Sequence, residues 1–98
     1  MIEFVLSPAA RQDLHDIWDY IAKDSRRAAD RLIARIQQSI EKIVAVPELG
    51  HPHQDLADET LRVWPERSYL IVYRAKTKPL QIVRIISGYR DIPSLFNS

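Results

Sequence analysis

Three arginines interrupt otherwise apolar stretches in the second half of the chain, and their side chains are the strongest candidates for chemistry. Arg62, Arg74 and Arg84 each stand in a run whose other residues favour a β-strand, and residues 88–91 (Gly-Tyr-Arg-Asp) directly follow the last run. A guanidinium group binds phosphate or carboxylate through paired hydrogen bonds, so arginines that converge on one sheet face form a site for an anion or for RNA. Convergence depends on strand register, because a shift of one residue moves a side chain to the opposite face.

The alternative role for these arginines is to pair with acids of the same chain. The sequence offers Glu3, Asp91 and the carboxylates of residues 48–59 as partners. Aromatic rings also stand near the arginines, which suits base stacking or an anchor in a protein interface. Most strand aromatics belong to a core instead, so we expect only Tyr89, which lies beyond the apolar run and beside Arg90, on a binding surface.

His51 and His53 stand two residues apart with Asp55 close by, which superficially resembles a metal site. No zinc or iron pattern accompanies them, and the chain has no cysteine, which excludes disulfides and thiol chemistry. The sequence also lacks a glycine-rich phosphate loop and a nucleophile elbow. It therefore predicts no metal, no cofactor and a protein that binds macromolecules rather than transforming a metabolite.

Charge is segregated along the chain, although the net charge is only +1. Residues 1–47 are neutral overall, residues 48–59 carry four acids and no base, and residues 60–98 carry seven Lys and Arg against two acids. A basic C-terminal third favours an acidic partner such as nucleic acid or an acidic protein surface. The alternative is a solvated surface that the acidic segment balances.

The first half of the sequence predicts a short strand and a helical hairpin. Residues 2–6 place apolar side chains at every second position, as in a strand with one buried face. Ser7-Pro8 is typical of a helix start, and Asp24-Ser25 breaks the apolar stripe and begins a second helix. Pro47 ends that helix, and residues 47–59 predict a loop. The short connection indicates that the helices are antiparallel.

The second half predicts strands, over residues 60–64, 68–75 and 80–87. Their short connections indicate an antiparallel meander, and the last two strands are apolar enough to be central. We therefore expect one α+β domain over residues 1–98, with an N-terminal strand, an antiparallel helical hairpin and a three-stranded antiparallel meander in one sheet. No membrane span or signal peptide is recognisable, which predicts a cytoplasmic location.

A basic ridge runs along the predicted second helix at positions i, i+4 and i+8: Arg27, Arg31 and Arg35. Like charges at this spacing repel, so something acidic is expected to compensate them. Aspartates at positions 13, 16 and 19 of the first helix are available for this purpose. The alternative is an acidic segment of a partner protein that lies over the helices.

Along nearly its whole length the chain resembles the RelE/ParE superfamily of toxins. The resemblance rests on a helical-hairpin segment, SPAARQDLHDIWDYIAKDSRRAADRLIARIQQSIEKI, on the turn PELGHP, and on two sheet segments, LRVWPERSYLIVYRA and IVRIISGYRDI. The combination is more specific than any one motif, and the fold that it implies agrees with the one predicted from periodicity.

Within this superfamily the chain is most similar to the ParE branch of type II toxins. The resemblance implies a toxin that poisons DNA gyrase, trapping it on cleaved DNA, and that a ParD-like antitoxin with a DNA-binding N-terminal half neutralises. On this interpretation the protein is not an enzyme, and DNA is contacted only through gyrase or the antitoxin. We expect target contacts at Arg74, Arg84, Tyr89 and Arg90, and antitoxin contacts at Trp18 and at the basic ridge.

The alternative within the superfamily is a metal-independent, ribosome-dependent mRNA endonuclease of the RelE type. That activity needs Arg62, Arg84 and Tyr89 or Arg90 on one open face, where they stabilise the scissile phosphate and assist proton transfer. The acidic stretch HPHQDLADE replaces the lysine-rich stretch of RelE-like nucleases, which argues against cleavage.

A second departure lies at Ser87, where ParE-like chains usually carry a histidine before the glycine. The serine removes an imidazole that could act as acid, base or hydrogen-bond donor. A third hypothesis follows: a non-toxic member that acts only in complex formation and regulation of its own promoter.

Overall fold

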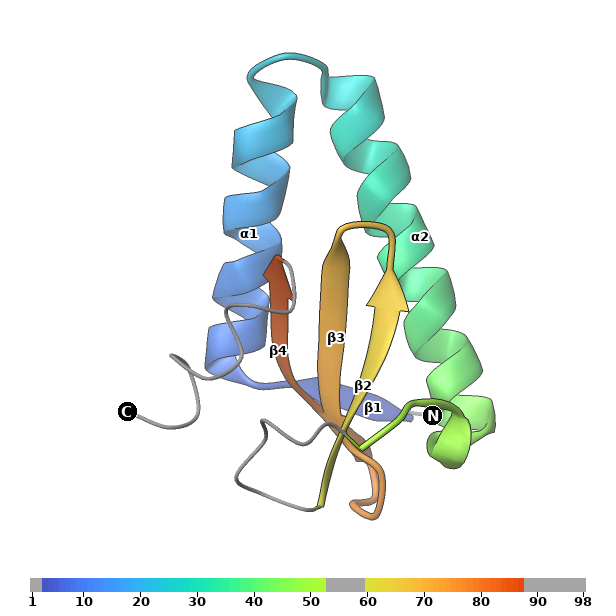
Figure 1. Cartoon of the computed structure of the whole chain (residues 1–98). Helices are drawn as coiled ribbons and strands as arrows, with labels where there is room; N and C mark the ends of the chain where they lie inside the picture. Colours follow the sequence, from blue (N-terminus) through green and yellow to red (C-terminus); the bar gives the residue numbers. More distant parts are fainter. Residues whose placement is uncertain (1–2, 53–59, 88–98) are drawn as a thin grey trace.

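Two long helices pack on a four-stranded sheet in the computed structural model, which describes residues 3–52 and 60–87 (Figure 1). The elements are β1 (Phe4–Leu6), α1 (Pro8–Ala22), α2 (Arg26–Ala45), a 3₁₀ helix η1 (Pro47–Leu49), β2 (Leu61–Glu66), β3 (Tyr69–Arg74) and β4 (Leu80–Ser87). Their order and types confirm the predicted α+β class with its helical hairpin and meander. No helix in the described part of the chain is long and apolar enough to cross a bilayer.

The sheet has the strand order β1-β4-β3-β2. The last three strands are antiparallel neighbours, as predicted, and β1 joins them in parallel with β4, with Phe4 opposite Leu80 and Leu6 opposite Ile82. A parallel pair needs a long crossover connection. Between β1 and β4 this connection consists of the helical hairpin followed by η1, β2 and β3. The inner strands are therefore β3 and β4, as the sequence predicted.

The helices begin where the sequence predicts. The Ser7 hydroxyl accepts a hydrogen bond from the Ala10 amide, and the Ser25 hydroxyl accepts one from the Ala28 amide, so each serine satisfies an otherwise unpaired helical N–H. Pro47 ends the helical pattern, but residues 47–49 form η1 rather than a loop. Figure 1 shows β4 beside α1, β2 beside α2, and the tip of the helical hairpin extending past the turn between β2 and β3.

Strand β2 extends beyond its predicted end at residue 64. It includes Pro65 and Glu66, which the sequence had suggested as part of a connection. Proline has no N–H to donate, so it is tolerated here because β2 is an edge strand. The turn to β3 is then only two residues long, and Arg67 adopts a positive φ of 58° within it.

Both faces of the sheet are apolar. The helix-facing cluster contains Ile36, Ile40 and Ile43 from α2 and the buried strand residues Ile71, Tyr73, Leu80, Ile82 and Ile85. Residues of β2, β3 and β4 form a second cluster on the opposite face: Leu61, Val63, Leu70, Val72 and Ile86. This double burial explains why β3 and β4 read as nearly continuous apolar runs.

A bulge in β4 changes which residues share a face. Val72 pairs with Arg84, whereas the next residue, Tyr73, pairs with Ile82, so Val83 is an extra residue in β4. Ile82 and Ile85 consequently lie in the same helix-facing cluster although they are three positions apart. The bulge also decides the surroundings of Arg84, which could not be read from the sequence.

Candidate functional site

Arg62 lies on the helix-facing side of β2, directly opposite Tyr73 of β3. Its Nη1 donates a hydrogen bond of 2.8 Å to the Gly50 carbonyl oxygen. The Tyr73 hydroxyl accepts a bond of 2.8 Å from the Gly50 amide and donates one of 2.7 Å to the Pro47 carbonyl. Arg62 and Tyr73 therefore fasten the segment that follows α2 to the sheet.

Gly50 is the point of closest approach in this contact. A Cβ atom at this position would lie 2.5 Å from the Tyr73 hydroxyl oxygen and 2.7 Å from the Val63 carbonyl oxygen, so no side chain fits without a shift. Burial raises the pKa of Tyr73, while the Gly50 amide and the charge of Arg62 oppose the increase. The phenol therefore stays protonated and keeps its bond to the Pro47 carbonyl.

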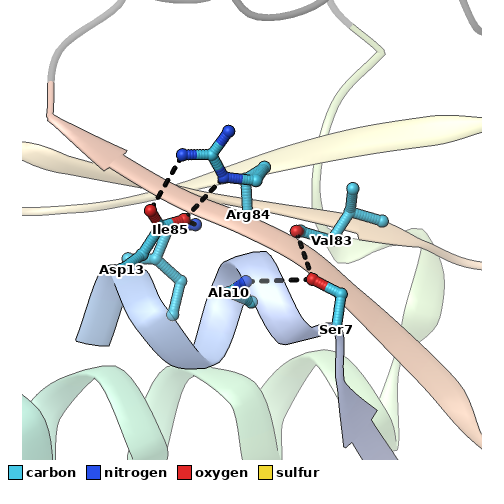
Figure 2. A network of polar contacts seen from close by, with 6 residues as sticks. All are labelled: Ser7, Ala10, Asp13, Val83, Arg84 and Ile85. Atoms are coloured by element: carbon cyan, nitrogen blue, oxygen red, sulfur yellow. Dashed lines mark hydrogen bonds and ion pairs between the residues drawn. The ribbon is translucent and has the colours of Figure 1, made fainter. Parts of the chain in front are cut away.

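Arg84 forms a two-pronged ion pair with Asp13 of α1 (Figure 2). Nε lies 2.7 Å from Oδ2 and Nη2 lies 2.8 Å from Oδ1, and the Ile85 amide donates a third bond of 2.9 Å to Oδ2. The hydrogen bond to Asp13 raises the pKa of the Arg84 guanidinium, although burial works in the other direction. Arg84 and Asp13 thus tie β4 to α1.

Side chains at the start of α1 replace a neighbouring strand along the outer edge of β4. Strand β1 ends at Leu6, after which the Ser7 amide donates to the Ile82 carbonyl at 2.9 Å and the Ser7 hydroxyl donates to the Val83 carbonyl at 2.7 Å. Asp13 then accepts from the Ile85 amide. As Figure 2 shows, Ser7 and Asp13 satisfy β4 backbone groups that β1 does not reach.

Arg74 lies on the opposite face of the sheet from Arg62. It stands opposite Leu61, a member of the second cluster, and its Nη1 donates a bond of 2.7 Å to the Thr60 hydroxyl. The structure therefore does not gather the strand arginines on one face: Arg62 binds Gly50, Arg74 binds Thr60, and Arg84 binds Asp13. The other two residues predicted for this surface, at positions 89 and 90, lie outside the described residues.

The predicted antitoxin residues lie in two separate places, with Trp18 on α1 beside α2 and the basic ridge on the flank of α2 that faces away from α1. Trp18 donates from Nε1 to Asp30 Oδ1 at 2.8 Å, and it borders a groove between the helices that is lined by Arg11, Leu14, His15, Trp18 and Ile33. At 3.6 residues per turn, Arg27, Arg31 and Arg35 are rotated by roughly 120° to 160° from Ile33. All three arginines are exposed. A helix lying in the groove would not cover the ridge.

The predicted compensation of the ridge by α1 is not found. Asp13 binds Arg84, and within residues 3–52 and 60–87 no ion pair joins the ridge to Asp16 or Asp19. The physical reason is geometric, because the ridge faces away from α1. Asp30 and Ile33 face α1 and so fix the orientation of α2, and the helical period then places the ridge on the other side.

Sequence reasoning did not recognise the importance of three residues: Asp13, Gly50 and Tyr20. Asp13 was assigned to the ridge, and Gly50 had been noted only as part of a loop. Tyr20 of α1 had not been considered, yet it is the most exposed large hydrophobic side chain of the described residues, at 72%. Tyr20 lies close to Tyr69. The pKa of Tyr69 is raised, mainly by burial and to a smaller extent by the nearby Tyr20 phenol.

Among the described residues, no three His, Asp or Glu side chains are arranged to hold a metal ion. His51 instead pairs through its backbone with Val63 on the outer edge of β2, with both N–H···O bonds at 2.9 Å. His53 and Asp55 of the suggested histidine cluster lie outside the described residues.

A helical hairpin that crosses over to place β1 parallel to β4, at the side of an antiparallel meander, is the layout that the resemblance to the RelE/ParE superfamily led us to expect. The family comparison matches residues 4–92 to the ParE toxin of the type II toxin-antitoxin system parDE. The match covers most of the 98 residues, and the chain belongs to this family.

The comparison with solved structures agrees in fold. A chain of the chromosomal ParDE toxin–antitoxin system from P. aeruginosa aligns with a TM-score of 0.74 and 23% sequence identity, over 91% of this chain and 98% of that one. The search of curated proteins found no match. The family assignment therefore rests on the family comparison, and the solved structure agrees with it in fold.

Proposed function

We propose that this ParE-family toxin inhibits DNA gyrase, trapping it on cleaved DNA, and that a ParD-like antitoxin neutralises it. The observation that carries the proposal is the family match over residues 4–92. A solved relative of the same fold belongs to a ParDE system, which supports the antitoxin as partner. The proposed activity is binding, without a reaction catalysed by the toxin itself.

The positions of the strand arginines favour this proposal over mRNA cleavage. A nuclease of the RelE type needs guanidinium groups that face the scissile phosphate and stabilise its developing charge. Arg62, on the helix-facing side of β2, is instead bound to Gly50, and Arg84, opposite Val72 of the second cluster, is bound to Asp13. Recruiting them to an RNA would require breaking bonds that hold the fold together.

We propose that the target surface includes Tyr89 and Arg90, which directly follow β4, together with Arg74. Arg84 acts in this proposal as a positioning residue. Its bond to Asp13 and the bond from the Ile85 amide to the same carboxylate hold the C-terminal half of strand β4 against α1. The segment that carries Tyr89 and Arg90 therefore leaves from an anchored strand.

We propose that the antitoxin fills the groove at Trp18 with an apolar side chain of a helix. Leu14, Trp18 and Ile33 give the groove an apolar floor, and Arg11 and His15 border it. A short helix with apolar residues three or four positions apart suits such a groove. The basic ridge on the other flank of α2 would need a separate contact.

The direct test is a gyrase supercoiling assay with purified toxin, relaxed plasmid and ATP, with and without a ParD-like antitoxin. We expect loss of supercoiling and accumulation of linear plasmid, both reversed by the antitoxin. A folded toxin in large molar excess that leaves gyrase unaffected would refute the proposal. Ribosome-dependent RNA cleavage by the same preparation would then support the nuclease.

Expression in cells without antitoxin separates both activities from the third hypothesis, a non-toxic member of the family. Growth arrest supports a toxin, whereas normal growth with abundant folded protein supports a role only in complex formation. The variant Ser87→His, which restores the usual family residue, is a useful control. A rise in toxicity in this variant would show that Ser87 is the cause of low toxicity in the wild type.

A further inference from the structure

The outer flank of α2 presents four exposed cations in a line: Arg27, Arg31, Arg35 and Lys42. With a rise of 1.5 Å per residue, successive arginines are about 6 Å apart along the helix axis, and the four span roughly 22 Å. They share one side of the helix, because steps of four and seven residues return to nearly the same direction. We call these four residues the α2 ridge.

Little on α2 itself neutralises the α2 ridge. No acid stands three or four residues from Arg31, Arg35 or Lys42, the positions at which a helical neighbour would pair with them. Asp30 stands three residues from Arg27, but its carboxylate accepts the Trp18 bond towards α1. Glu41 is exposed and is rotated by about 100° from Lys42.

The neighbouring strand does not neutralise it either. Glu66 of β2 accepts a hydrogen bond from the Ser39 hydroxyl of α2. No ion pair joins any of the four cations to another side chain within residues 3–52 and 60–87. The positive charge of the α2 ridge is therefore left to the solvent or to a ligand.

The composition of the α2 ridge indicates which kind of ligand it fits. Ala34 and Gln38 lie between the cations and the exposed Glu41 borders them, about 20° from Ala34, and no exposed aromatic or large aliphatic residue stands among them. Protein interfaces draw their energy from buried aromatic and apolar anchors, which this surface lacks. Phosphate contacts need only cationic side chains in register with a backbone.

We propose that the α2 ridge binds the phosphate backbone of duplex DNA, without sequence preference and separately from the groove at Trp18. The ligand class is a polyanion with regularly spaced phosphates, and the toxin contributes up to four cationic contacts. This surface would add affinity wherever the toxin meets DNA in a larger assembly. It does not depend on the gyrase proposal, because it concerns the toxin and DNA alone.

The experiment measures binding of the purified chain to a fluorescently labelled, mixed-sequence duplex of about two helical turns, by anisotropy across a salt series. Each neutralised phosphate contributes about −0.9 to the slope of log K against log salt concentration, so the wild-type slope should lie between about −3 and −4. The Arg31→Ala variant should reduce the slope by about one, with a similar loss on any duplex sequence.

Two variants control for fold and for total charge. Arg26→Ala removes the same charge from an exposed residue of the same helix, but Arg26 is rotated by about 140° from Arg31 and should leave the slope unchanged. Arg31→Lys keeps a cation and should also keep the slope. An equal loss in Arg26→Ala and Arg31→Ala would contradict the proposal, because it would show an effect of net charge alone.

The decisive variant reverses three charges, Arg27→Glu, Arg31→Glu and Arg35→Glu, and its circular dichroism spectrum checks that it is folded. We expect loss of DNA binding at every salt concentration. A glutamate-rich helical peptide is the competing probe. If wild-type protein binds that peptide but not DNA, or if the folded triple variant binds DNA as the wild type does, the proposal is overturned.

Discussion

Arginine plays two different roles in the sheet and in the helical hairpin of this protein. In the sheet, Arg62 and Arg84 reach across to Gly50 and Asp13 and join segments that are far apart in the chain. On α2, Arg31 and Arg35 extend into solvent from one flank of the helix. The same side chain therefore stabilises the fold where an acceptor faces it and offers a binding surface where none does.

The comparison shows that an arginine in an apolar strand does not by itself indicate a catalytic site. Burying a guanidinium group is unfavourable unless hydrogen bonds compensate it, so a strand arginine that persists beside a core must have found partners. In this chain the partners are the Gly50 carbonyl, the Thr60 hydroxyl and the Asp13 carboxylate. Surface arginines carry no such requirement, and their function has to be sought in what they bind.

The largest effect on stability is expected from Asp13→Ala. The change leaves the Arg84 guanidinium without its carboxylate and the Ile85 amide without an acceptor, in a pair whose side chains are only 26% and 13% exposed. We expect a loss of about 2 to 4 kcal/mol in the free energy of unfolding, measured by urea denaturation. Asp16→Ala, at an exposed position of the same helix, should change it by less than about 0.5 kcal/mol. Equal losses in the two variants would contradict the structural role of Asp13.

The next effect is expected from Gly50→Ala. The new Cβ would meet the Tyr73 hydroxyl at 2.5 Å, so the segment after η1 must move away from the sheet. We expect a loss of about 1 to 3 kcal/mol, as for other overpacked sites, with weakening of the Arg62 contact. The companion variant Gly50→Ala with Tyr73→Phe, which removes the obstructing hydroxyl oxygen, should recover part of the loss. No recovery would mean that the Val63 carbonyl, at 2.7 Å, and the ring carbon Cε1 of residue 73, at 2.8 Å, set the limit.

Alkaline pH tests the same contact through Tyr73. Burial raises the pKa of this phenol above its ordinary value near 10, so the unfolded chain releases the proton at lower pH than the folded chain does. The associated stability is present below about pH 10 and declines as the pH rises through the folded-state pKa. Between about pH 9 and 11, the urea denaturation midpoint of the wild type should therefore fall further than that of the Tyr73→Phe variant. Parallel curves for the two proteins would rule out this contribution.

The smallest effect is expected on α2. Arg31→Ala removes one repulsive neighbour from Arg27 and Arg35 and breaks no bond of the described structure, so stability should change by less than about 0.5 kcal/mol, in the stabilising direction. Thermal unfolding at low salt is the appropriate measurement, because screening weakens the repulsion. A clear destabilisation would show that the arginine has a structural partner and would remove the contrast with the sheet.

Local chemistry made much of the fold predictable. The serine caps at Ser7 and Ser25, the break between the helices and the two central strands all depend on neighbouring residues, and each is confirmed. The end of β2 was predicted too early, because Pro65 breaks strands except at a sheet edge, and edge position is a property of the whole sheet.

The site depended on long-range geometry that local patterns do not carry. Arg84 and Asp13 are 71 residues apart, and their contact follows from the bulge at Val83 and from where β1 ends. The separation of Trp18 from the basic ridge was, in contrast, accessible from the helical period once the face of α2 that meets α1 was known. The family resemblance supplied the function class, which periodicity alone could not.

The measurement that most directly tests this account is a double-mutant cycle on the free energy of unfolding with Asp13→Ala, Arg84→Ala and both together. If Arg84 serves the fold through Asp13, the double variant should lose less than the sum of the single losses, with a coupling of about 1 to 3 kcal/mol. Losses that add to within about 0.5 kcal/mol would contradict the account and return Arg84 to the candidates for target contact.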